Sequence, residues 1–123
     1  MRIVSVYDKA PTLLETSVRI PAGSSISETA YTAGLGVVGI ILPDNLDGAT
    51  QISFQTSIDE GRTWFNVYDA DGEVAPTAVA GTVLRLLPTQ LYGVAWLRIR
   101  LGTSAAPVAA SASRTFTVLL KEI

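Results

Sequence analysis

The sequence predicts an all-β protein, an antiparallel two-sheet β-sandwich of jelly-roll-like topology with about eight to nine strands. Two observations lead to this fold class. Apolar and polar residues alternate in several short runs, which is the period of a half-buried strand, and the clearest run covers residues 94–101. Clusters of Gly, Pro, Asn, Asp and Ser separate the runs at short intervals, and no segment reads convincingly as a helix.

The expected strands follow one another from residue 13 to near the C-terminus. They cover residues 13–20, 27–31, 36–42, 51–58, 64–69, 82–86, 94–101 and 114–122. The run 36–42 is nearly all apolar, which favours a strand covered on both faces. Residues 102–113 are small, polar and rich in alanine, so we expect a long loop there.

The run 94–101 divides its side chains between two faces. One face carries Leu97, Ile99 and Leu101. These three residues, together with Ile52 and Phe54 of the run 51–58, are the predicted core residues. The opposite face carries Trp96, Arg98 and Arg100. Trp and Arg are enriched at protein interfaces, so this second face is an interface candidate. A ligand platform and a second buried layer are the alternatives.

Residues 1–12 precede the first clear strand. We expect them to form an N-terminal arm attached to a single sandwich domain, residues 13–123. The arm carries apolar residues that a solvated tail would not need, namely Ile3, Val4, Val6 and Tyr7. We therefore expect the arm to contact another protein, for example by adding a strand to a neighbour.

The composition excludes several classes of function. Only 16% of the residues are charged, a low share for a free-standing monomer, which favours a protein that works inside an assembly. The net charge of −2 gives no basic footprint, so nucleic acid is not an expected partner. The longest apolar run, residues 37–43, is too short to span a bilayer. Asp8 and Lys9 come too early for a signal peptide, so we expect synthesis and assembly in a cytoplasm.

The chain has no cysteine and no histidine. It therefore lacks disulfides, thiolate metal sites, the commonest general base and the middle member of a Ser-His-Asp triad. We expect no catalytic residues, no metal and no cofactor, and hence no enzyme.

Two acidic clusters invite a calcium hypothesis, because carboxylate oxygens at alternate positions can hold that ion. The clusters are Asp69, Asp71 and Glu73, and Asp44, Asn45 and Asp47. Neither has the full loop of an EF-hand, and solvated turns are the favoured interpretation. The adjacent Asp59 and Glu60 lie on one turn, so they cannot flank a glycosidic bond from opposite sides.

Residues 57–64 read Ser-Ile-Asp-Glu-Gly-Arg-Thr-Trp and join two expected strands. Gly61 can take a positive φ without the steric cost of a Cβ. The Asp59 carboxylate can accept hydrogen bonds from backbone N–H groups in its own turn. We expect Thr63 to bond back across this turn and Trp64 to anchor it to the core.

This run resembles the Asp-box, or BNR-type, turn of sialidases and other β-propellers. The defined positions of that motif are held here by Ser57, Asp59, Gly61, Thr63 and Trp64. The resemblance implies a structural turn that takes no part in chemistry. A propeller needs one such unit per blade and this chain has one copy, so a sialidase-like propeller is excluded.

A wider resemblance covers roughly residues 35–120. Four segments occur in an order that is similar to small tailed-bacteriophage virion proteins: Val-Gly-Ile-Ile-Leu-Pro at 38–43, Ile-Ser-Phe-Gln-Thr-Ser at 52–57, Val-Ala-Trp-Leu-Arg-Ile-Arg at 94–100, and Arg-Thr-Phe-Thr-Val at 114–118. The chain departs from them at Glu60, where glycine is frequent.

The resemblance implies a structural virion protein, first of all a capsid decoration or cement protein assembled in the host cytoplasm. Its expected partners are the major capsid protein or other virion proteins, and further copies of itself, as in a trimer. A tail or fibre accessory subunit is one alternative. Another is a carbohydrate-binding module displayed on the virion, with Trp64 and Trp96 stacking on a glycan.

Overall fold

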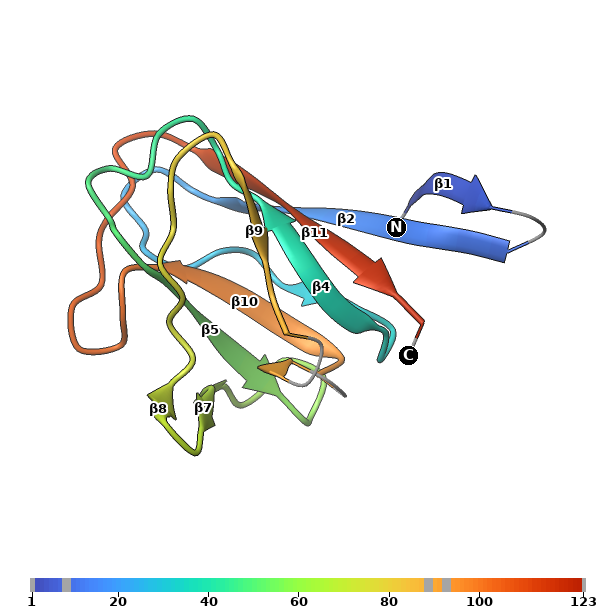
Figure 1. Cartoon of the computed structure of the whole chain (residues 1–123). Coiled ribbons are helices and arrows are strands. Elements are labelled where there is room, and N and C mark those ends of the chain that lie inside the picture. The colour runs from blue at the N-terminus through green and yellow to red at the C-terminus, as the bar shows by residue number, and fades with distance from the viewer. Residues whose placement is uncertain (1, 8–9, 88–89, 92–93, 123) are drawn as a thin grey trace.

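The computed structural model describes residues 2–7, 10–87, 90–91 and 94–122, and for residues 2–7 and 10–12 it describes the backbone alone. The strands form two antiparallel sheets and a small ribbon (Figure 1). The five-stranded sheet has the order β1 (Arg2–Tyr7), β2 (Ala10–Ile20), β11 (Arg114–Lys121), β4 (Gly36–Ile41) and β9 (Val83–Arg85). The four-stranded sheet has the order β3 (Ala30–Tyr31), β10 (Trp96–Leu101), β5 (Ile52–Ser57) and β6 (Phe65–Asn66). The ribbon pairs β7 (Tyr68–Asp69) with β8 (Gly72–Glu73).

The strand pairing is nested. β2 pairs with β11, β3 with β10, β4 with β9, and β5 with β6, so partners are matched from the ends of the chain toward its middle. Successive pairs fall alternately in the two sheets. A long hairpin wrapped around a sandwich has this topology, which is that of a jelly roll. The predicted all-β sandwich is confirmed, and no α-helix occurs in the part of the chain that the structure describes.

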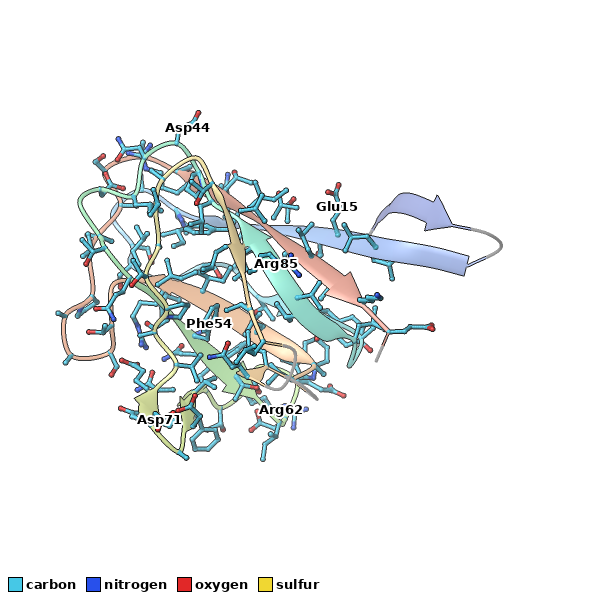
Figure 2. The ribbon with its side chains drawn as sticks, viewed as in Figure 1. Glu15, Asp44, Phe54, Arg62, Asp71 and Arg85 are labelled. Carbon is cyan, nitrogen blue, oxygen red and sulfur yellow. The ribbon has the colours of Figure 1, made fainter. Side chains whose placement is uncertain are left out.

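The core lies between the two sheets. All five predicted core residues are fully buried, which confirms the faces assigned from their alternation: Ile52, Phe54, Leu97, Ile99 and Leu101. The facing sheet contributes Ile20, Ile40 and Phe116 among others. Figure 2 shows Phe54 between the two sheets. Burying side chains of this size stabilises the fold by about 1.5–3 kcal/mol each.

Two expected strands are shorter than their sequence pattern indicated. Residues 27–31 reduce to β3, because Ser27 N–H donates to Ile99 O in one sheet and Glu28 N–H donates to Arg19 O in the other. The chain is crossing between sheets there. The expected strand 64–69 is divided at Val67, whose N–H bonds Phe54 O and whose carbonyl accepts from Val74 N–H.

The expectation that residues 36–42 are covered on both faces is wrong. β4 is an inner strand of its sheet, but the outward side chain of Ile41 is 40% exposed. Its neighbour in the register is Val83 of the edge strand β9, which is 54% exposed. The apolar run therefore supplies both the core and an open apolar patch on the outer face.

The N-terminal segment is a strand. β1 pairs antiparallel with β2, and β2 begins at Ala10, three residues before the expected strand at residue 13. β11 pairs with β2 only between Leu14 and Ile20, so within the described strands the start of β2 is paired with β1 alone. Figure 1 shows this hairpin extending past the body of the sandwich.

Candidate functional site

The outer face of the four-stranded sheet carries the aromatic and cationic side chains. Leu97 and Ile99 point into the core, so Trp96, Arg98 and Arg100 of β10 point outward. Register places Tyr31 of β3 and Ser57 of β5 on either side of Trp96. This is the face that the sequence singled out as an interface candidate.

The 57–64 turn is held by its own side chains. Ser57 Oγ donates to Asp59 Oδ1 at 2.7 Å and accepts the Gly61 N–H at 2.8 Å. Asp59 Oδ1 also accepts the N–H groups of Arg62 at 3.1 Å and Thr63 at 2.8 Å. The hydrogen bond from Ser57, followed by those from Thr63, lowers the pKa of Asp59 to about 2. Asp59 is therefore a turn-forming carboxylate that stays ionised at neutral pH.

Two consecutive residues of this turn have left-handed backbone. Glu60 has φ 63° and Gly61 has φ 88°. A side chain at Glu60 is strained in this region, which gives a physical reason why glycine suits that position. The turn ends at Trp64, whose Nε1–H donates to Gly61 O at 3.0 Å. The edge of the indole is thus fixed against the turn.

Trp64 packs on the outer face and not in the core. The Arg98 guanidinium lies over the Trp64 ring, with Cζ 4.1 Å from the ring centroid. One step along the same face, Trp96 contacts Tyr31, with centroids 4.7 Å apart and planes tilted by 41°. We call these four residues the aromatic–arginine platform: Tyr31, Trp64, Trp96 and Arg98. Tyr31 is 52% exposed, so the platform is open to solvent at this end.

The charge of Arg98 is not neutralised in the described part of the chain. Arg98 forms no ion pair there, and its buried Nε has no hydrogen-bond partner. Its contact with Trp64 is a cation–π interaction, which leaves the positive charge in place. A buried donor without an acceptor is costly.

Arg100 has a different environment. Its guanidinium bonds Ser53 Oγ at 3.3 Å and Asn66 Oδ1 at 2.6 Å, and it pairs with the Glu73 carboxylate at 3.5 Å. The Arg100 and Glu73 side chains are only 7% and 14% exposed. Glu73 also accepts the Ser104 N–H, so the ribbon β7–β8 covers this end of the sheet. Here the sheet face is a closed, buried layer.

Members of the two acidic clusters form hydrogen bonds and ion pairs within the protein. Asp69 accepts the N–H of Asp71 at 2.8 Å within the ribbon turn, and Figure 2 shows Asp71 at its outer tip. Asp47 forms a bidentate pair with Arg114, at 2.9 and 3.0 Å, which lowers the pKa of its carboxyl. Among the residues described, no group of three His, Cys, Asp or Glu side chains could hold a metal ion.

Sequence reasoning missed the two ion pairs that are largely buried in the described part of the chain. Asp47 and Arg114 are 67 positions apart, and Glu73 and Arg100 are 27 apart, so no local pattern relates them. The arm residues named as interface candidates lie outside the side chains that the structure describes, and their role stays a prediction: Ile3, Val4, Val6 and Tyr7.

No protein-family model, curated protein or solved structure matches this chain. The described residues contain no helix long and apolar enough to cross a membrane.

Proposed function

We propose that this chain is a structural protein of a tailed-bacteriophage virion, a decoration protein that binds the capsid shell and stabilises it. The observation that carries the proposal is the β1–β2 hairpin. The start of β2 pairs with β1 alone among the described strands, and the hairpin extends past the sandwich (Figure 1). A two-stranded ribbon is marginally stable in water, so this one is suited to lying against a neighbour.

The outer face of the five-stranded sheet supports the same proposal. Ile41 and Val83 are adjacent in the register and are 40% and 54% exposed. The hairpin belongs to this sheet, so both features lie on one side of the sandwich. Two adjacent exposed apolar side chains on one sheet face suit a protein–protein contact. We place the shell on this side, with the major capsid protein as the partner.

Shell binding explains the low charged fraction of 16%. Each copy that binds adds its interface free energy to the assembled shell, so occupancy stabilises the particle by mass action. The edge of β1 is open to a further strand in the described part of the sheet. We propose that pairing at this edge makes the protein a homo-oligomer, as in a trimer.

The test has two stages. First, the copy number of this chain in purified particles should match the capsid lattice, whereas a number matching the tail would favour a tail accessory role. Second, a variant lacking residues 1–11 should stay folded, because the β2–β11 ladder from Leu14 to Ile20 remains. Its affinity for undecorated shells should fall by about tenfold or more, which is 1.4 kcal/mol of binding free energy.

Point substitutions sharpen this test. Val83→Glu places a charge on the apolar patch and should weaken shell binding. Ile58→Glu is the matched control, because Ile58 is 86% exposed in the 57–64 turn and outside the five-stranded sheet. The proposal fails if the protein is a monomer at high concentration and the truncated form still decorates shells at full occupancy.

A further inference from the structure

We infer that the aromatic–arginine platform is a binding site for a carboxylate-bearing sugar, a hexuronic acid residue of an acidic polysaccharide. Arg98 would take the carboxylate, and Trp96 with Tyr31 would pack against the sugar ring. This site is a second function, independent of shell binding.

Arg98 presents an oriented, unpaired positive charge within the described residues. Its guanidinium is fixed over Trp64 and carries a charge without a carboxylate partner in the described residues. A guanidinium presents its donors in a planar fork that matches the two oxygens of a carboxylate. Because the fork is already held in place, a bound carboxylate would cost little ordering of the side chain.

The second step is the aromatic pair beside it. Trp96 is two residues from Arg98 on the same face of β10, a separation of about 7 Å along a strand. That separation is comparable to one pyranose unit. Trp96 and Tyr31 are in contact and Tyr31 is half exposed, so the pair presents apolar area to solvent. A pyranose has an apolar C–H face that packs on aromatic rings, and aromatic side chains contribute large contact areas.

The combination selects the ligand class. A neutral sugar would leave the charge of Arg98 unused, and a bare phosphate would leave Trp96 and Tyr31 unused. A uronic acid residue uses both, because its carboxylate is attached to the ring that packs on the aromatic pair. The 57–64 turn has a part in this site, since it fixes Trp64 beneath Arg98.

The location of the platform is compatible with shell binding. The platform lies on the four-stranded sheet, whereas the β1–β2 hairpin and the Ile41–Val83 patch belong to the five-stranded sheet. Two sheets of a sandwich face opposite ways. A copy bound to a shell through its five-stranded sheet would present the platform outward, toward the surface of a host cell.

The experiment titrates the isolated full-length protein with trigalacturonate and follows tryptophan fluorescence. Both tryptophans of the chain belong to the platform, so the signal reports on the site directly. We expect saturable binding that weakens by about tenfold or more in Arg98→Gln, the loss anticipated for a charge-assisted hydrogen bond. The fully methyl-esterified trisaccharide should bind as weakly as that variant.

Two further variants complete the design. Arg85→Gln removes an equal charge from exposed β9 on the other sheet and should bind normally. Tyr31→Ala alters an exposed ring and should weaken binding even if Arg98→Gln does not fold. Binding that is absent, equal for the methyl ester, equal in all variants, or displaced by the same concentration of inorganic phosphate would overturn the proposal. None of these outcomes bears on the shell-binding test.

Discussion

Arg98 and Arg100 are two residues apart on the same face of β10, yet their surroundings differ in kind. Arg100 bonds Ser53, Asn66 and Glu73 and is buried. Arg98 has an aromatic ring beneath it, no carboxylate partner among the described residues, and an unsatisfied Nε. One strand face thus carries a closed structural layer at one end and an open, charged platform at the other.

The two arginines differ in whether the fold satisfies their guanidinium groups. At Arg100 both terminal guanidinium nitrogens donate to internal acceptors, so the fold itself accounts for the residue. At Arg98 the internal structure orients the guanidinium but does not neutralise it. A structural requirement explains the first arrangement. The second arrangement is the one for which we propose a ligand.

The largest effect is expected for Arg100→Ala. This substitution leaves the Glu73 carboxylate nearly buried without its cation, and it should lower the free energy of unfolding by about 3 kcal/mol, the lower end of the range for broken buried pairs. The lower end applies because Glu73 keeps the Ser104 N–H. Urea denaturation measures it, with Glu73→Gln as the milder control. A loss below about 1 kcal/mol, typical of surface pairs, would contradict the closed layer.

A smaller effect is expected for Gly61→Ala. Gly61 has φ 88°, and an added Cβ would meet the Trp64 ring at 3.5 Å. The left-handed backbone should cost about 1–2 kcal/mol of stability. Gly23→Ala is the matched control for backbone strain without a ring contact, because Gly23 has φ 84° and open space around it. Because 3.5 Å is an ordinary van der Waals contact, the two losses in thermal denaturation should be about equal, and a clearly larger loss for Gly61→Ala would contradict this geometry.

Much of the fold could be predicted from sequence because a strand with one buried face alternates apolar and polar residues. Alternation assigned Leu97 and Ile99 to the core and Trp96 to the opposite face, and the structure has them so. This alternation does not indicate which residues cover the outer face of the four-stranded sheet. The cover over Arg100 comes from Glu73 on a separate ribbon, and Asp47 reaches Arg114 across the chain.

The candidate site was therefore predictable only in outline. Trp96 and Arg98 could be selected because they share a face of one strand. Tyr31 could not, because the pairing of β3 with β10 is what places it beside Trp96. Trp64 was expected in the core, as the Asp-box resemblance implies. Its position under Arg98 follows from the Nε1–H bond to Gly61 O, which ties the ring to the turn.

The support beneath the platform should depend on pH through Asp59. Its folded-state pKa of about 2 lies below its usual 3.8, so its contribution to stability is complete above pH 3.8 and is lost as pH falls through about 2. Asp59→Asn should lower the melting temperature by a few degrees at pH 7, less than the change for Arg100→Ala. The difference in melting temperature between Asp59→Asn and the unsubstituted protein should disappear toward pH 2. A difference in melting temperature that stays constant with pH would mean that the charge of Asp59 does not contribute.

The smallest effect on stability is expected for Arg98→Met. The substitution removes a cation–π contact with Trp64 worth about 0.5–1 kcal/mol at an exposed site. It also removes a buried Nε that has no acceptor, which is a gain of similar size, and the methionine keeps apolar contact with the ring. The free energy of unfolding should therefore change by less than about 1 kcal/mol. Denaturant unfolding of Arg98→Met and Arg100→Met side by side measures the contrast directly. Equal losses would mean that Arg98 belongs to the same structural layer as Arg100, and its open charge would then need no ligand to explain it.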